Sequence, residues 1–546
     1  MSIPFPGKSQ TGRRRVISRD AAIFPIRTVT KKIIIVGGGS AGWVTAAYLG
    51  RMLGADLPAG VQISLIESPD IGPIGVGEGT FPSIRKTLGR IEIDERLLLT
   101  EASATFKQGV RFANWVRGDD HYYHLFEPAH RPEGLDLLPY WLLGEAGSRS
   151  WNDVCGVQKR VVDAMHGPKR GNEPAYAAPL AYAYHFDALA FADVLKRHAV
   201  RQGVKHVADE VTEVRLGPDG SIDSLLTRGH GALSGDLYID CTGFRARLIG
   251  EAMGIKFASR RDTLFVNRAV ALQLPYADPN APLPSCTIAS AERSGWMWDI
   301  GLRQRRGIGY VYSADHCSDD EAVRVLCRHA GVSEAAANPR LLSFEAGYRP
   351  AQWHRNCVAI GLSAGFIEPL EATGIGFAET ASLVLAAIFP WNGPLEVAAR
   401  QFNAAMSRRY ENVIDFIKAH YCLSQRRDSD FWIDNCRSES IPASLQEKLE
   451  RWRYRPPSFV DIDYGHDTFT EENWRQVIYG MEFRTDLTAR GGALRHRDAA
   501  HAAFASANRS ADKALAYLPS HRDLVEAMCA EGAAIPGGNG PAGIGR

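Results

Sequence analysis

Residues 31–51, KKIIIVGGGSAGWVTAAYLGR, constrain the fold most, because they pass from an apolar run through glycines into a helical pattern. Residues 33–36 are all β-branched and apolar, which is typical of a strand covered on both faces. Gly37, Gly39 and Gly42 follow with the spacing G-x-G-x-x-G: the first lets the chain turn, the second lets backbone approach a pyrophosphate, and the third lets helix and strand pack closely. The new helix would offer N–H groups to a phosphate. The stretch therefore predicts a dinucleotide-binding unit.

A second predicted strand supports this interpretation. Residues 61–70, VQISLIESPD, run apolar into Glu67, about where an acidic side chain would bind a ribose hydroxyl. A lone G-x-G-x-x-G is a weak signal, and a tight strand-to-helix turn without a ligand is the alternative. Strand, glycines, helix and acid together favour the nucleotide site.

The composition argues against several classes of function. Lys and Arg total 63 against 62 for Asp and Glu, so the net charge of +1 gives no reason to expect a nucleic-acid or membrane partner. No stretch approaches the run of about 18 apolar residues that predicts a membrane span. The nine cysteines are scattered and none forms a C-x-x-C pair, which favours a reducing cytoplasm over a disulfide framework or a metal site.

The 546 residues are enough for two or more lobes, or for one elaborated enzyme domain. Residues 1–30 are expected to be a flexible extension, because their arginines are not followed by the apolar run of an export signal. Residues 31–400 would form the nucleotide-binding core with an inserted sheet region, and residues 401–531 a mostly helical C-terminal region. Residues 532–546 are rich in Gly and Pro and would be a disordered tail.

Two later segments extend the nucleotide site. Residues 237–248, LYIDCTGFRARL, and residues 356–389, which begin as a strand at Cys357 and enter a long helix after Gly374, resemble the second and third FAD-contacting segments of the glutathione-reductase type. Three dispersed segments favour FAD over NAD, because an NAD domain would be one contiguous unit. We therefore expect an α/β fold built on an FAD-binding domain of the glutathione-reductase and aromatic-hydroxylase type.

The segment 101–115, EASATFKQGVRFANW, alternates like a strand and places Lys107 on the face opposite Phe106 and Gln108. Taken alone, this pattern favours a solvated lysine over a catalytic one. Residues 121–127, HYYHLFE, are dense in aromatic and imidazole rings, which serve packing in most proteins but would also suit an aromatic substrate.

Farther along, Trp296 and Trp298 point the same way from one predicted strand and could form a bulky wall. At this point the chain resembles the flavin-dependent tryptophan halogenases. The motifs that carry the resemblance are GGGSAGW at 37–43, GVGEGTFP at 75–82, TFKQGVRFANW at 105–115, GWMWDI at 295–300 and FIEPLEATGI at 366–375. Members of this family use reduced FAD, oxygen and a halide to make hypohalous acid, which passes through a tunnel to a lysine and halogenates an electron-rich aromatic carbon.

The resemblance assigns roles by motif position. Lys107 would capture the oxidant, and an amine suits this role because burial lowers its pKa and leaves the nitrogen nucleophilic. Glu371 would polarise the oxidant or accept the ring proton, with Glu368 as its rival. Backbone amides of Thr373 and Gly374, at the start of a helix, would bind chloride or bromide.

His124 and Phe126 match family positions that flank the aromatic substrate. Trp296 and Trp298 would keep the substrate away from the flavin. No metal is expected. The predicted FAD site comprises Gly37, Gly39, Ser40, Ala41, Gly42, Glu67, Gly77, Glu78, Gly361 and Ile375.

Three departures from the family make free tryptophan a doubtful substrate. Ala372 replaces a common Ser, Gly301 replaces the Pro that usually ends the tryptophan signature, and residues 472–483 bear little likeness to the region that clasps the amino-acid end of tryptophan. An indole, a peptide-borne or carrier-borne ring, or another phenolic or indolic metabolite would fit as well.

The resemblance also implies a separate NAD(P)H-dependent flavin reductase as partner, and a homodimer, which is common in the family. Two other interpretations stay open at this stage. One is an FAD-dependent monooxygenase that hydroxylates an aromatic compound, and the other is a flavin-binding protein without halogenating activity.

Overall fold

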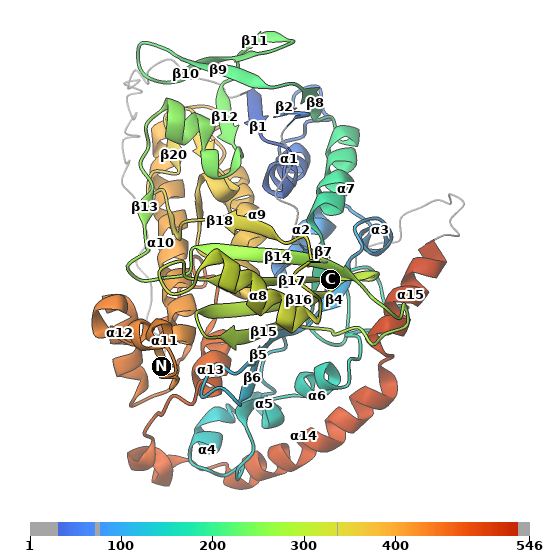
Figure 1. The fold of residues 1–546 in the computed structure, drawn as a ribbon, viewed down its shortest axis with the longest axis vertical. Coiled ribbons are helices and arrows are strands. Elements are labelled where there is room, and N and C mark those ends of the chain that lie inside the picture. The colour runs from blue at the N-terminus through green and yellow to red at the C-terminus, as the bar shows by residue number, and fades with distance from the viewer. Residues whose placement is uncertain (1–30, 71, 73–76, 336, 533–546) are drawn as a thin grey trace, which may run out of the picture.

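The computed structural model describes residues 31–70, 72, 77–335 and 337–532 (Figure 1). Its nucleotide-side sheet has the strand order β20-β21-β12-β1-β2-β8, and all neighbours are parallel except β20 and β21. The first predicted strand is confirmed, since residues 33–35 are at most 1% exposed. The strands of this sheet are β1 (Lys32–Val36), β2 (Gln62–Glu67), β8 (Lys205–Ala208), β12 (Leu237–Asp240), β20 (Trp353–His354) and β21 (Cys357–Ala359).

Three helices pack around this sheet: α1 (Ser40–Met52), α7 (Ala188–Arg201) and α9 (Thr373–Ala387). Helix α1 contacts both α7 and α9, so the glycine turn and the late helix are neighbours in space. A separate three-stranded sheet lies at the top of Figure 1 and consists of β9 (Val211–Leu216), β10 (Ile222–Thr227) and β11 (Gly231–Leu233).

A seven-stranded sheet crosses the middle of the molecule in the order β18-β14-β17-β16-β15-β5-β6 (Figure 1). Helix α8 (Asp319–Ala330) packs on β14 and β17. The strands of this sheet are β5 (Gly109–Ala113), β6 (His121–Leu125), β14 (Arg268–Pro275), β15 (Thr287–Glu292), β16 (Gly295–Gly301), β17 (Arg305–Tyr312) and β18 (Arg340–Ser343).

Two small sheets complete the strands. One has the order β3-β7-β4, with β3 (Gly77–Gly79), β4 (Thr105–Lys107) and β7 (Ala183–Asp187), and the other joins β13 (Ala258–Ser259), β19 (Gly347–Tyr348) and β22 (Gly365–Phe366). The single strand predicted around Lys107 is therefore two strands in different sheets. The chain changes sheet at Gly109, whose φ is +153° and whose position leaves no room for a side chain, since a Cβ would lie 2.4 Å from the His124 carbonyl oxygen.

Residues 401–532, all of which are described, are mostly helical. Helix α14 runs along the lower edge of Figure 1, and α15 returns to pack on α3 and β4. The remaining helices are α2 (Ser83–Arg90), α3 (Glu95–Glu101), α4 (Leu138–Leu142), α5 (Trp151–Val154), α6 (Gln158–Asp163), α10 (Leu395–Cys422), α11 (Asp430–Asn435), α12 (Ala443–Trp452), α13 (Glu471–Gly480), α14 (Arg497–Tyr517) and α15 (His521–Gly532).

The predicted division of the chain at residue 400 lies inside the long helix α10. The predicted extension, residues 1–30, lies outside the described residues, as does the predicted tail after Gly532, which itself ends α15. One stretch, Leu370–Ala387, is apolar enough by length and composition to cross a membrane, but more than half of it is buried inside the protein, and the core helix of a soluble protein passes the same test.

Candidate active site

The glycine turn has the three features that a dinucleotide needs. Gly37 has a φ of +112°, and a Cβ there would lie 2.2 Å from the Cys241 carbonyl oxygen. A Cβ on Gly42 would lie 1.9 Å from the Gly37 carbonyl oxygen, so this glycine lets α1 pack on β1. By contrast, a Cβ on Gly39, just before Ser40 at the start of α1, would meet no atom within 4 Å. The open space is thus at the N-terminal end of α1, where a phosphate would bind.

The other predicted FAD segments adjoin this turn. A Cβ on Gly361, whose φ is +78°, would lie 2.6 Å from the Cβ of Ala41. The Ser363 hydroxyl donates to the Asp240 carbonyl oxygen, which ties the third segment to the second. Glu67 ends β2 and pairs with Lys196 at 2.9 Å, while Ile375 is buried in the first turn of α9. This arrangement fits FAD.

Glu78 and Gly77 are on β3, one strand away from the lysine strand β4 across β7. Burial raises the pKa of Glu78 to about 7, and the negative charge of Asp187 adds to the increase. This carboxyl can therefore carry a proton near neutral pH.

Lys107 is fully buried at the end of β4. Its Nζ has no hydrogen-bond partner among the described residues, and it lies 5.6 Å and 5.4 Å from the ring centroids of Phe81 and Phe126. Burial lowers the pKa of this amine to about 8, although the negative charge of Glu371 acts in the opposite direction. The alternative of a solvated lysine is therefore wrong.

Glu371 is buried and held by two histidines through a single oxygen. Its Oε1 lies 2.8 Å from Nδ1 of His124 and 3.2 Å from Nε2 of His420, whereas Oε2 has no partner among the described residues. Burial alone would raise the pKa of this carboxyl, but the two histidines outweigh it and hold the pKa below its usual value. Glu371 and Ala372 have φ values of +63° and +53°, an unfavourable backbone for these residues that is typical of functional sites.

The rival glutamate has a different environment. Oε2 of Glu368 accepts hydrogen bonds from Nε1 of Trp296 and from the hydroxyl of Tyr421, both at 2.9 Å. Burial raises the pKa of Glu368 to about 7. Trp296 and Trp298 lie side by side with their ring centroids 6.4 Å apart, and both are buried. Glu368 thus holds Trp296 by a hydrogen bond, whereas Glu371 is held by His124 and His420.

Helix α9 begins at Thr373, directly after Ala372. Thr373 is buried, and a Cβ on Gly374 would meet no atom within 4 Å, so this helix start faces open space. A Cβ placed on Gly79 would lie 3.1 Å from Nζ of Lys107 and 3.4 Å from the Cβ of Ala372. The lysine amine and Ala372, which directly precedes the proposed halide position, therefore both lie next to Gly79.

Aromatic rings surround Lys107 and His124. Phe81 lies 5.6 Å from Phe126 and 5.4 Å from Phe469 between ring centroids, and Phe469 stacks on Phe416 at 3.7 Å. Phe81 belongs to a motif quoted above, but Phe416 and Phe469 carry no local sequence signal. Together these rings give Lys107 and His124 apolar, aromatic surroundings of the kind that bind aromatic substrates.

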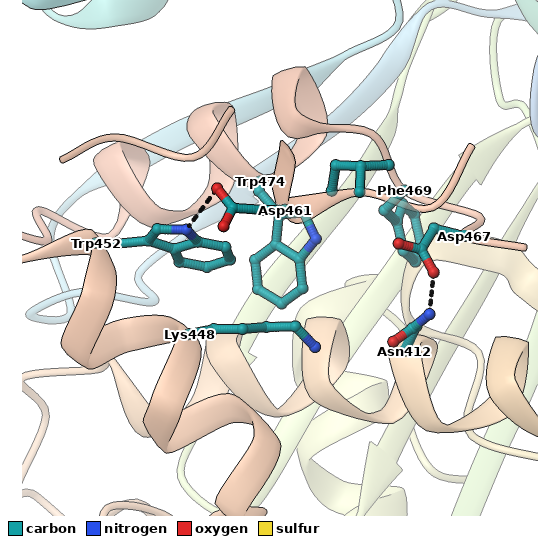
Figure 2. Close-up of a pocket in the computed structure, with 8 residues that line it drawn as sticks. Asn412, Lys448, Trp452, Asp461, Asp467, Phe469 and Trp474 are labelled. Carbon is teal, nitrogen blue, oxygen red and sulfur yellow. Dashed lines mark hydrogen bonds between the residues drawn. The ribbon is translucent and has the colours of Figure 1, made fainter. Parts of the chain in front are cut away.

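Figure 2 shows a small hollow whose lining includes Phe469 together with Trp452, Trp474, Lys448 and Asp461. Its volume of about 10 Å³ is enough for about one water molecule. The hollow is therefore not a substrate site.

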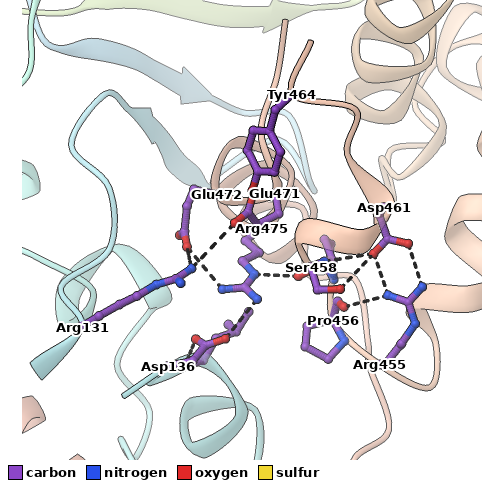
Figure 3. A network of polar contacts seen from close by, with 12 residues as sticks. Arg131, Asp136, Arg455, Pro456, Ser458, Asp461, Tyr464, Glu471, Glu472 and Arg475 are labelled. Atoms are coloured by element: carbon purple, nitrogen blue, oxygen red, sulfur yellow. Dashed lines mark hydrogen bonds and ion pairs between the residues drawn. The ribbon is translucent and has the colours of Figure 1, made fainter. Parts of the chain in front are cut away.

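The segment 472–483, which bears little likeness to the region that clasps tryptophan in the family, contacts the site. It forms most of α13, which packs on β6, and Nδ2 of Asn473 lies 2.8 Å from Nε2 of His124. A cluster of charges lies beside it (Figure 3): Arg475 pairs with Asp136 and Glu472, and Arg131 pairs with Glu472. Each of these four charged side chains is therefore already paired with one of opposite charge.

Comparisons with known proteins point to one family. A family model described as tryptophan halogenase matches residues 32–497. The tryptophan 6-halogenase of Streptomyces toxytricini is 35% identical over 521 residues, which cover 91% of this chain and 98% of that protein. A tryptophan halogenase from Shewanella frigidimarina has a similar crystal structure, with a TM-score of 0.88 and 38% identity over 92% of this chain and 98% of that one. A flavin-dependent halogenase from Brevundimonas has a TM-score of 0.82 and 30% identity over 91% and 99% of the two chains.

Proposed function

Because the chain belongs to the flavin-dependent tryptophan halogenases, we propose that Lys107 delivers the halogen to an aromatic carbon and that Glu371 accepts the proton that this carbon loses. Enzymes of this family use reduced FAD from a reductase, with oxygen and chloride or bromide. Bound reduced flavin supplies the electrons for the reaction of oxygen that oxidises halide to hypohalous acid.

One observation carries the proposal. Nζ of Lys107 and Oε2 of Glu371 are both buried and have no hydrogen-bond partners among the described residues. An unpaired buried polar atom costs about 1–3 kcal/mol, so two such atoms on side chains whose charges interact point to partners that arrive during the reaction. Nζ would bind the oxidant, and Oε2 would receive the ring proton.

Other features support the remaining roles. The start of α9 at Thr373 and Gly374 suits a halide, because a helix start offers N–H groups without partners in the helix and a Cβ on Gly374 would meet no atom within 4 Å. Trp296, held by Glu368, would separate substrate from flavin. His124 and Phe126 would flank the substrate ring.

Mass spectrometry of an indole panel tests the proposed function. Protein, FAD, a flavin reductase, NADH and bromide should give brominated product only when bromide is present. Hydroxylated product that forms without halide would instead support an aromatic monooxygenase. If no compound of the panel is modified, the result would support a flavin-binding protein without halogenating activity.

We expect the chain to depend on a separate reductase. The sheet around β1 uses one G-x-G-x-x-G turn, and the sequence offers no second contiguous unit for NAD(P)H. Protein with FAD, halide, substrate and NADH alone should therefore turn over far more slowly than with added reductase. Equal rates in the two mixtures would contradict this expectation.

We also expect indole to be halogenated at least as well as tryptophan, and at its most electron-rich carbon. The charges near α13 pair with one another, so binding depends mainly on ring burial, which is worth about 2–3 kcal/mol. Competition between the two substrates at equal concentration measures the preference. A clear preference for tryptophan, modified at one benzo-ring position, would show that a clasp exists.

We further propose a homodimer in the cytoplasm. The dimer is supported by the family resemblance, since a homodimer is common in this family. All nine cysteines are free, which suits a reducing compartment.

A further inference from the structure

The hydrogen bonds around Glu371 determine where protons lie on His124. Oδ1 of Asn473 accepts from the backbone N–H and the hydroxyl of Thr470, so the Asn473 amide nitrogen must face the other way, toward Nε2 of His124 at 2.8 Å. That nitrogen donates, so Nε2 of His124 accepts. The ring proton is then on Nδ1, which donates to Oε1 of Glu371. A neutral His124 satisfies every one of these contacts.

His420 is oriented the opposite way. Its Nδ1 lies 2.9 Å from the carbonyl oxygen of Phe416, one turn earlier in α10, and a carbonyl only accepts, so Nδ1 carries a proton. Its Nε2 lies 3.2 Å from the same Oε1 of Glu371. With a neutral ring and an ionised carboxylate, two lone pairs would face each other in a site where both side chains are fully buried. This contact therefore requires a proton of its own.

We propose that His420 and Glu371 share one proton, so that His420 is a positioning residue that sets the charge and orientation of the catalytic carboxylate. This inference rests on the proposed function of Glu371 for its role in the reaction, but the location of the proton follows from the contacts alone. The remaining oxygen, Oε2, is left free.

Few other groups face this pair. Among the described residues, the other titratable side chains coupled to Glu371 are Lys107 from β4 and Tyr122 and His124 from β6. His420 packs against the rings of Phe112, Trp115 and Phe416, none of which titrates. Lys107 and His420 are thus the cations that can balance the carboxylate.

The shared proton fits the proposed reaction. When the halogenated ring regains aromaticity, its C–H bond breaks, the electron pair returns to the ring, and the proton goes to Oε2 of Glu371. The pair then holds two protons instead of one and releases one to solvent after the product leaves. A cationic His420 keeps Glu371 ionised before this step, even though the carboxyl is buried.

His420→Gln is the first test, because glutamine can still donate to Oε1 but cannot carry the extra proton. Without the cation, burial should raise the pKa of Glu371, and the acid limb of single-turnover halogenation should move up by about 1–3 pH units. His124→Asn, which replaces a neutral donor, should move the limb by clearly less. Formation of hypohalous acid, measured with a chemical trap, should be retained in His420→Gln. An unchanged acid limb in His420→Gln would overturn the proposal.

The second test does not depend on activity. In protein labelled with ¹⁵N-histidine, the signals that disappear in His420→Gln should show, in the wild-type protein near pH 7, either a doubly protonated ring or an Nε2 bonded to a protonated carboxyl. A ring protonated on Nδ1 alone beside an ionised Glu371 would overturn the shared proton. If the wild-type protein halogenates no substrate, the proposed function fails while this measurement still decides the inference.

Discussion

Lys107→Ala is expected to lower the formation of halogenated product by a factor of about 100 or more, because removing a group that takes part in proton transfer or activation typically costs 10²–10⁴ in rate. Hypohalous acid should still form, since Lys107 does not belong to the flavin or halide positions. Product is measured by mass spectrometry, and the oxidant with a chemical trap. The variant should stay folded, because the substitution removes an amine that is buried without a partner.

Lys107→Arg separates charge from reactivity. Arginine keeps a cation at this position but stays protonated at any accessible pH, so it offers no nucleophilic nitrogen. In the wild-type protein the pKa of Lys107 is lowered to about 8, so the neutral amine and the product rate should both rise as the pH passes through 8. The arginine variant should be as inactive as the alanine variant at every pH. Substantial product from either variant would show that Lys107 is a structural residue and does not deliver the halogen.

Much of the fold could be predicted because its signals are local. The β-branched run at 33–36, the three glycines and the acid at Glu67 are close together in sequence, and each role follows from backbone geometry. The family resemblance and the FAD cofactor are likewise confirmed by comparisons that cover most of the chain.

Lys107 shows where local reasoning failed. Alternation says which residues share a face but not whether that face is covered, and α15, more than 400 residues away, helps to cover β4. The candidate active site likewise depends on residues that are far apart in the sequence. His420, Asn473 and Phe469 meet Glu371 and its neighbours through contacts of high sequence separation, so no local motif contains them.

Glu371→Gln is expected to lower the rate of halogenation by about 10²–10⁴ at every pH, the usual effect of removing a general base. Glutamine keeps an oxygen that can accept from His124, so the side chain should stay in place, but its amide cannot take the ring proton. Binding of FAD, measured by fluorescence, should be unchanged, because Glu371 is held by histidines and has no contact with the glycine turn in the described residues.

A substrate deuterated at the reacting carbon shows which step of the reaction the Glu371→Gln substitution slows. With Glu371 present, the proton leaves quickly and deuterium should have little effect on the rate. In Glu371→Gln the breaking of the C–H bond should become the slow step, so a primary isotope effect should appear. The matched control is Glu368→Gln, which changes a carboxyl that holds Trp296 and should produce no such isotope effect. An isotope effect in Glu368→Gln but not in Glu371→Gln would reverse the assignment of the two glutamates.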